Sequence, residues 1–403
     1  MGCARRALDQ MDGGARLKVL FLTDSLSDLD GVGRYAMCLI AALEKEIPDL
    51  EVEVLLARKH RPTSKSIPSH WKLSVALPPD YFFHMSPSRF WPNVLIGTWN
   101  IWRRARHADL VHAIKDYPHS LTGLLASKMA GVPCIATAHG TYTIQPLLVP
   151  RHSRLAAWTY RRFAAMISVS RYTRRRLLAL MEKRGLDAER VHVIPNCVDV
   201  ENYVDEQHSE GQLWADKRFT LSIGELKERK GLHIAIEAWC QSASKHPDLH
   251  HFVVGNRSGD DYEKKLHSIV ESAGLSDRVH FLGNIDEALK IELLQKAEVF
   301  VHTPVTAEDG GFEGFGIVYL EAAASGTPSI GTLDCGAEDA IIDEGTGFLV
   351  EQTVAAAADA LDKLLGDPDL RKTMGAAGRA HAASQTWDHN ATQVARIYLE
   401  SLC

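Results

Sequence analysis

The residues from Gly310 to Pro328 read GGFEGFGIVYLEAAASGTP and predict a glycine-rich loop that leads into a helix. Ile317, Leu320 and Ala324 recur at helical spacing, and the Gly-Thr-Pro sequence near the end is typical of a helix stop. A helix start leaves backbone N–H groups without partners, and glycines let an anion approach them closely. We therefore expect a phosphate group to bind the amides of Gly314, Phe315, Gly316 and Ile317.

Two carboxylates flank this loop. Glu313 lies in the loop, and Glu321 follows after seven intervening residues, about two turns into the helix. A carboxylate repels phosphate, so we expect each to accept hydrogen bonds from hydroxyl groups on either side of the anion, as acidic residues do with ribose. A diphosphate with a sugar at each end fits this arrangement. The alternative is a capped surface helix with two solvated glutamates.

The segment from Glu313 to Glu321 resembles the E-x7-E signature of retaining family-4 glycosyltransferases with the GT-B fold. In that family the first Glu lies by the donor sugar and the second by the nucleotide ribose. The resemblance implies an α/β fold in which two Rossmann-like, doubly wound domains face each other across a cleft. Matches to the family run from about Val19 to about Tyr398.

The N-terminal part of the chain is predicted to form the first domain. Lys18–Thr23 is an apolar run typical of a buried parallel strand, and Gly31 and Gly33 then form a turn before a helix. The two glycines resemble the family's N-terminal glycine loop, which implies contact with the donor diphosphate; a plain tight turn is the alternative. Further strands, which alternate with helices as in a doubly wound sheet, are expected at 51–57, 72–77, 109–113, 133–138, 165–169 and 191–194.

A histidine follows one of these strands directly. The strand at 133–138 ends at His139, and ligands bind at the carboxyl ends of strands in open α/β sheets. His139 matches the family's histidine after this strand, which implies a position near the donor sugar. The alternative is a polar residue that is simply satisfied at a strand end.

A basic turn opens the second domain. Gly224–Gly231 follows a predicted strand and resembles the family's Gly-Arg-x-x-x-x-Lys-Gly element, in which Arg and Lys neutralise the donor diphosphate. Lys230 matches the family lysine, but Glu225 replaces the arginine. A carboxylate beside a diphosphate would repel it, so we expect Glu225 to pair with Lys227 or Arg229, or to face the hydroxyls of the donor sugar.

The second half of the chain also alternates strands, expected at 218–223 and near 250–255, 278–281 and 298–302, with helices. A polar stretch from Asp205 to Asp216 is predicted to be a linker. The predicted organisation is a loose leader over 1–16, an N-terminal acceptor domain over 17–204, a C-terminal nucleotide-sugar domain over 205–385, and a helix over 386–403 that returns to the N-terminal domain.

The amino-acid composition argues against several classes of protein. The 403 residues are 45% hydrophobic, enough for two full cores, and no run of 18 uncharged apolar residues is present, so a membrane span is not expected. The start of the chain lacks the apolar stretch of a signal peptide. Seven scattered cysteines show neither C-x-x-C pairs nor zinc-like spacing, which indicates reduced thiols, a cytoplasmic location and no metal site.

Charge differs between the two halves. Residues 1–200 contain 28 Lys and Arg against 17 Asp and Glu, a net charge of +11, and residues 201–403 contain 17 against 34, a net charge of −17, which sum to −6. Aromatic residues from Trp71 to Trp102, followed by Arg103, Arg104 and Arg106, predict either a membrane-interface surface or a wall that stacks on sugars; core packing is the alternative. Peripheral contact with the anionic inner membrane surface therefore stays open.

The resemblance implies a retaining hexosyltransferase that moves a sugar from a nucleotide-sugar donor to a glycan, a lipid-linked acceptor or a small molecule. His139, Glu313 and Lys230 are the predicted catalytic residues. No cofactor, metal or nucleic acid is expected, since Lys230 and the helix start can stabilise the leaving group. The alternatives are a nucleotide-sugar epimerase or phosphorylase on the same fold, and a non-catalytic scaffold that binds nucleotide.

Overall fold

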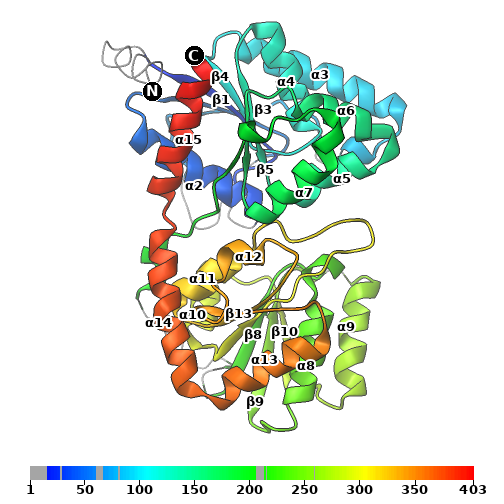
Figure 1. The fold of residues 1–403 in the computed structure, drawn as a ribbon, viewed down its shortest axis with the longest axis vertical. Coiled ribbons are helices and arrows are strands. Elements are labelled where there is room, and N and C mark those ends of the chain that lie inside the picture. Colours follow the sequence, from blue (N-terminus) through cyan, green and yellow to red (C-terminus); the bar gives the residue numbers. More distant parts are fainter. Residues whose placement is uncertain are drawn as a thin grey trace. The chain divides into compact units, whose positions relative to one another are not determined.

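Two parallel sheets organise the computed structural model, which describes residues 16–27, 30–59, 67–79, 82–205, 213–214, 216–257 and 259–403 (Figure 1). One compact unit contains the residues up to Asn196 together with Trp387–Cys403, and the other contains Cys197–Thr386. Residues 197–204, which we had assigned to the N-terminal domain, therefore group with the second unit. One reason is that the side chain of Gln295 donates to the carbonyl of Tyr203 at 3.0 Å. Most of the predicted leader and of the predicted linker lies outside the described residues.

The first unit contains a seven-stranded sheet in the order β3-β2-β1-β4-β5-β6-β7. All neighbouring strands are parallel. This confirms the predicted strands and the doubly wound order, in which the chain starts at the centre and reverses direction beside β1. The strands are β1 (Lys18–Thr23), β2 (Glu51–Leu56), β3 (Lys72–Val75), β4 (Leu110–Ala113), β5 (Cys134–Ala138), β6 (Ala165–Ser168) and β7 (Val191–Val193).

Helices cover both faces of this sheet (Figure 1). They are α2 (Gly31–Glu46), α3 (Pro87–Ala105), α4 (His119–Ala130), α5 (Thr141–Leu148), α6 (Pro150–Tyr160), α7 (Arg171–Met181) and α15 (Trp387–Leu402). The terminal helix α15 packs on α2, and the hydroxyl of Tyr398 lies 2.6 Å from Nδ1 of the buried His112. Nε2 of His112 lies 2.8 Å from the hydroxyl of Thr137 on β5, so both ring nitrogens are satisfied inside the core.

The second unit contains a six-stranded parallel sheet in the order β10-β9-β8-β11-β12-β13. The strands are β8 (Arg218–Ile223), β9 (Leu249–Val254), β10 (Val279–Gly283), β11 (Val299–Val301), β12 (Ser329–Thr332) and β13 (Gly347–Val350). The helices are α8 (Leu232–Ser242), α9 (Asp261–Ser272), α10 (Glu287–Lys296), α11 (Ile317–Ser325), α12 (Ala337–Ala340), α13 (Val354–Gly366) and α14 (Pro368–Ser384). Strand β12 was not predicted.

The strand order of the second sheet reverses between β8 and β11. Ligands of open α/β sheets bind outside the carboxyl ends of the strands at such a reversal. The turn Gly224–Gly231 follows β8, and the stretch from His302 to Gly316 follows β11. The topology therefore brings the predicted phosphate-binding segments to one edge of the second sheet.

Candidate active site

The glycine-rich loop ends at Gly316, which is the N-cap of α11. Its φ is +83°, and a Cβ there would lie 2.7 Å from the ring of Tyr319, so the position favours glycine for both backbone and space. In the described part of the chain, no backbone or side-chain acceptor bonds the N–H groups of Phe315, Gly316 or Ile317. These amides at a helix start have the arrangement that binds anions.

The segment after β12 fixes this loop in place. The N–H of Gly336 donates to the carbonyl of Glu313 at 2.8 Å. A Cβ on Gly336 would lie 2.2 Å from the carbonyl oxygen of Gly314, so the two backbones touch. Phe312 and Phe315 are buried on either side of Glu313. The loop is therefore held by backbone contact with Gly336 and by the buried side chains of Phe312 and Phe315.

Lys230 and Glu313 form an ion pair through Nζ and Oε2. Lys230 ends the short 3₁₀ turn Glu228–Lys230, and the following Gly231 has φ +63° and packs on the backbone of Thr303. Burial raises the pKa of Glu313. The nearby Lys230, His302 and Arg229 lower it by more than burial raises it, so the pKa lies well below its usual value. The structure thus joins two residues that the sequence analysis had placed on different parts of the donor.

His302 lies against this pair and was missed by the sequence analysis. It follows β11, its side chain is fully buried, and its Nε2 lies 3.6 Å from Oε2 of Glu313. Burial lowers the pKa of His302, Glu313 raises it, and Lys230 and Arg229 lower it, so the net shift is downward. Only the apolar residues that precede His302 in β11 signalled that this side chain would be enclosed.

Glu321 is buried in α11 and is paired with a lysine that the sequence analysis did not identify. Nζ of Lys290, on α10, lies 2.8 Å from Oε1 of Glu321 and 2.9 Å from Glu287. Because Glu313 is 8% exposed and Glu321 is 3% exposed, the alternative of two solvated surface glutamates is wrong.

Glu225 pairs with its basic neighbours, as predicted for the position where the family has arginine. Its Oε2 lies 3.0 Å from Nζ of Lys227 and 3.3 Å from the guanidinium of Arg229. Partial burial raises the pKa of Glu225, but Lys227, Arg229 and Lys230 lower it below its usual value. The carboxylate is therefore ionised and offsets part of the positive charge of this turn.

His139 belongs to the first unit and directly follows β5. Its Nε2 donates to the carbonyl of Ile114 at 3.0 Å, and its backbone N–H donates to the buried carboxyl of Asp116 at 3.3 Å. Burial and the charge of Lys115 lower the pKa of His139 to about 4. The imidazole is therefore neutral near pH 7, and Nδ1 remains as the ring atom that can accept a hydrogen bond.

Gly31 and Gly33 differ from the predicted turn because α2 already begins at Gly31. The N–H of Gly33 donates to the side chain of Asp30 at 2.6 Å, and a Cβ there would lie 2.6 Å from the carbonyl oxygen of Ser27. The prediction of a glycine turn before the helix is therefore wrong. Gly33 lets the backbone of Ser27 pack closely, and its N–H binds the N-cap residue Asp30. Gly31 is exposed and has open space beside it.

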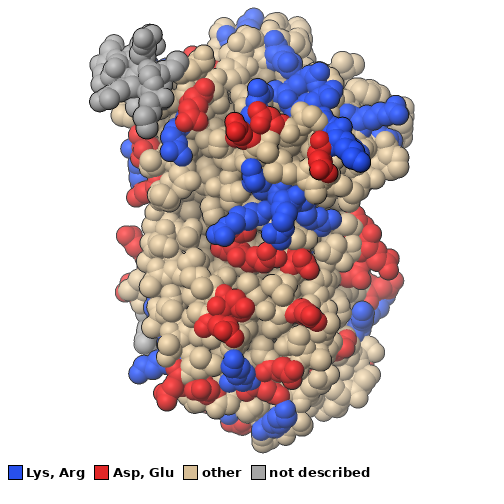
Figure 2. Space-filling view, in the orientation of Figure 1, with Lys and Arg blue, Asp and Glu red and all other residues tan. Residues whose placement is uncertain are grey.

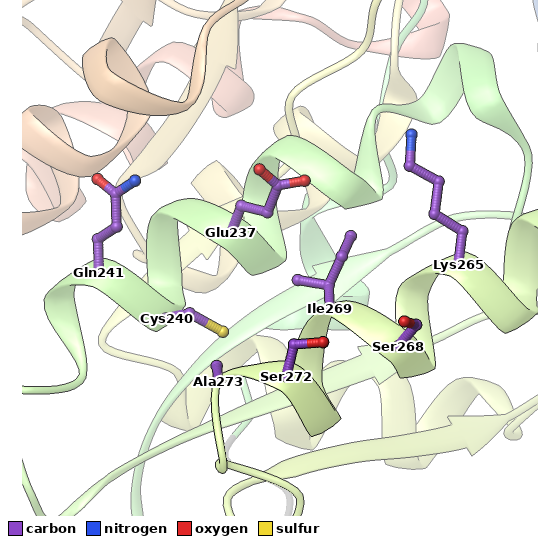
Figure 3. A pocket seen from close by; sticks show the side chains of 8 residues that line it. All are labelled: Glu237, Cys240, Gln241, Lys265, Ser268, Ile269, Ser272 and Ala273. Carbon is purple, nitrogen blue, oxygen red and sulfur yellow. The ribbon is translucent and has the colours of Figure 1, made fainter.

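An open groove between α8 and α9 lies apart from these residues (Figure 3). Cys240 and Ile269 line it together with polar side chains, and burial and Glu237 raise the pKa of Cys240 to about 11. The thiol is thus a poor nucleophile. Within the described ranges, no group of three or more His, Cys, Asp or Glu side chains is placed to hold a metal ion.

Two family models together match most of this chain. The family model described as Glycosyltransferase Family 4 matches residues 29–202, and the model described as Glycosyl transferases group 1 matches residues 204–381. The phosphatidyl-myo-inositol mannosyltransferase of Mycobacterium leprae is 32% identical over 293 residues, which cover 72% of this chain and 73% of that protein. This chain belongs to the glycosyltransferase family. A D-inositol 3-phosphate glycosyltransferase of Corynebacterium urealyticum is 33% identical over a shorter stretch, 44% of this chain and 41% of that protein.

Solved structures show the fold of this glycosyltransferase. Anabaena HepE in complex with UDP and glucose superposes with a TM-score of 0.73 at 22% identity, over 94% of this chain and 98% of HepE. WaaG, a glycosyltransferase involved in lipopolysaccharide biosynthesis, superposes with a TM-score of 0.69 at 18% identity, over 94% of this chain and 98% of WaaG. The predicted GT-B fold, with two Rossmann-like α/β domains, is therefore confirmed.

Proposed function

We propose that this glycosyltransferase transfers a hexosyl group from a nucleotide-sugar donor with retention of anomeric configuration. The observation that carries the proposal is the buried Glu313, paired with Lys230 beside the amides that open α11. A diphosphate fits the amides of Phe315, Gly316 and Ile317. The structure of HepE, which has the same fold, holds UDP and glucose.

In the proposed mode of donor binding, Glu321 accepts hydrogen bonds from the ribose, and Glu313 and His139 contact the donor sugar. Lys230 and the loop amides stabilise the diphosphate as the bond from the anomeric carbon breaks and its electron pair moves to the leaving oxygen. The acceptor hydroxyl supplies the new oxygen and gives its proton to the departing diphosphate. Positive charge from Lys230 and from the start of α11 takes the part that a divalent metal plays elsewhere, so we propose no metal and no cofactor.

The test is a screen of UDP-sugars and GDP-sugars, first for binding by thermal shift and then for transfer to glycan, lipid and inositol acceptors. Transfer that inverts the anomeric centre would contradict the retaining mechanism. Formation of an epimer from the nucleotide sugar alone, or of a sugar phosphate on addition of orthophosphate, would support the alternative enzymes. Binding without any reaction would support a scaffold.

We also propose that the acceptor is lipid-linked and that α3 contacts an anionic membrane surface. Helix α3 packs on α4, and four of its large apolar side chains are exposed: Trp91 is 50% exposed, Leu95 69%, Ile96 59% and Trp99 53%. Phe90 and Val94 fill the opposite, buried face of the same helix. The aromatic segment is therefore partly core, as the alternative predicted, and partly a surface patch.

The charge around this apolar face favours an anionic partner. Arg103 and Arg106 are exposed near the end of α3, and the helix contains no Asp or Glu. In Figure 2 the visible face of the first unit carries more Lys and Arg than Asp and Glu, and that of the second unit carries more Asp and Glu. In the described ranges, no helix is long and apolar enough to cross a membrane. Insertion of Trp and Leu side chains into the interface is the corresponding surface mode of binding.

Sedimentation with liposomes tests this contact. Replacing Leu95 and Ile96 by Ser should reduce the fraction bound to vesicles of phosphatidylglycerol and phosphatidylcholine by about tenfold, since two apolar side chains no longer leave water. Binding of the unchanged protein should also fall as salt rises. Replacing the exposed Val204 and Ile342 of the second unit by Ser is the matched control. Equal sedimentation with and without anionic lipid would contradict the contact and point to a soluble acceptor.

A further inference from the structure

His302 is a buried histidine whose ring has no hydrogen-bond partner among the described residues. Neither Nδ1 nor Nε2 is bonded, although the side chain is fully enclosed. Buried polar groups are nearly always bonded, so an unpartnered imidazole inside a proposed binding site calls for an explanation. A hydrogen bond that forms in only one state of the enzyme would provide it.

The surroundings of His302 fix the position of the ring. Its backbone N–H donates to the carbonyl of Ile330 at 3.0 Å, and its carbonyl accepts from the hydroxyl of Tyr319 at 2.6 Å. The rings of Tyr319 and Phe300 lie 5.3 Å and 6.1 Å from the ring of His302, measured between ring centroids. The ring therefore has little room to turn away from Glu313.

The carboxylate oxygen that already binds Lys230 lies within reach of His302. Nε2 of His302 is 3.6 Å from Oε2 of Glu313, and a shift of somewhat less than an ångström would give a hydrogen bond of about 2.9 Å. The ionisable side chains that act on the ring are Glu313, Lys230 and Arg229, and the ring of Tyr319 lies beside it. Glu313 is the carboxylate among them, so it is the group that a charged imidazole would pair with.

Lys230 cannot satisfy Glu313 and a diphosphate equally well at the same time. If Nζ turns to the diphosphate, as the proposed function requires, Glu313 remains buried with a negative charge and without its lysine. A buried charge that loses its partner is strongly unfavourable. A second cation within reach of the same oxygen would remove this obstacle.

We propose that His302 replaces Lys230 as the partner of Glu313 when a nucleotide sugar binds, and that it takes up one proton from solvent in doing so. His302 is thus a positioning residue that keeps Glu313 in place for the donor sugar. This role rests on the proposed function. In the free protein, Lys230 and Arg229 oppose a charge on His302, and the diphosphate would cancel part of their effect. Donor affinity should therefore rise as pH falls towards 6, where the imidazole is protonated more readily.

Calorimetry with a nucleotide sugar tests proton uptake directly. UDP-glucose and GDP-mannose are the probes, because their diphosphate diesters do not titrate near neutral pH and bring no proton change of their own. The binding enthalpy at pH 7 is measured in phosphate, in imidazole and in Tris, which differ in ionisation enthalpy. We expect a net uptake of up to one proton per site, and a smaller uptake at pH 8.5.

The variant His302→Gln should abolish this uptake, weaken the pH dependence of binding, and lower kcat more than it raises KM. The matched control is His280→Gln, on β10 of the same unit, which should leave the uptake unchanged. If His302→Gln does not fold, the unchanged protein still decides, because zero proton uptake between pH 6 and 8 would overturn the role. Binding of neither probe would instead contradict the proposed function, and the role of His302 with it.

Discussion

Removing the charge of Lys230 should destabilise the second unit as well as abolish transfer. At pH 8.5, where His302 is neutral and does not replace the lysine, Lys230→Ala leaves Glu313 buried without its cation, and breaking a buried ion pair from one side costs about 3–5 kcal/mol. The side chains of Lys230 and Glu313 are 16% and 11% exposed, so water screens part of the interaction between their charges. The expected loss of unfolding free energy is therefore about 2–3 kcal/mol. For a unit of this size each kcal/mol shifts the melting temperature by roughly 2–4 °C, which predicts a fall of about 4–12 °C.

A double-mutant cycle separates this effect from the loss of catalysis. Glu313→Gln removes the charge that Lys230 neutralises, so Lys230→Ala combined with Glu313→Gln should melt several degrees above Lys230→Ala alone. Transfer should stay lost in the double variant, because the diphosphate still lacks its lysine. Lys227→Ala is the control, since its pair with Glu225 is half-exposed and should contribute under about 1 kcal/mol.

The assay is thermal unfolding monitored by calorimetry, and sugar transfer is measured on the same samples. An unchanged melting temperature in Lys230→Ala would refute the reasoning, because it would mean that Glu313 is neutral or already has another partner in the free protein. Full transfer activity in Lys230→Ala would refute its assignment to the leaving diphosphate and would transfer that role to Lys227 or Arg229.

Three further outcomes are expected. Glu321→Ala should weaken nucleoside diphosphate binding in calorimetry by roughly 1–3 kcal/mol because the ribose hydroxyls lose an acceptor, and unchanged affinity would exclude this role. Glu225→Arg should tighten nucleoside diphosphate binding, whereas weaker binding would show that the turn is built differently from the family element. Burial raises the pKa of Asp116 to about 6, above the unfolded value of 3.8, so stability falls as pH rises between these values. Asp116→Asn should therefore stabilise the first unit at pH 7 by roughly 1–3 kcal/mol in urea unfolding, with no gain below pH 4.

Strands that consist of continuous apolar residues could be predicted from the sequence. A strand that is buried only because other strands flank it could not. Lys18–Thr23 and Arg218–Ile223 begin their sheets as expected because nearly every side chain in them is buried. Strand β12, Ser329–Thr332, has Ile330 as its one large apolar side chain and is nevertheless buried throughout. Its burial is set by β11 and β13 on either side, which a local pattern cannot show.

The candidate site divides in the same way. Glycine spacing predicted the helix start at α11 and the proposed anion site there, since a glycine at a helix start has a local cause. The pairs of Glu321 with Lys290 and of Glu313 with Lys230 join residues that are far apart in the sequence, and only the folded sheet brings them together. A glycine is favoured at position 33, but because the backbone of Ser27 packs closely against it and not because the chain turns there.

The charges around the donor site explain why the substitution at Glu225 can be tolerated. The ion-paired side chains of this site carry three positive charges, on Lys227, Arg229 and Lys230, against two negative charges, on Glu225 and Glu313. The other carboxylates of the turn after β8 and the loop after β11, Glu228, Glu308 and Asp309, are exposed to solvent and are left out of this count. A net charge of about +1 is one short of the two negative charges of a nucleotide-sugar diphosphate. The start of α11 contributes roughly half a charge, and a protonated His302 would contribute one more. The proposed proton uptake on donor binding would therefore compensate in this chain for the arginine that the family resemblance implies at the position of Glu225.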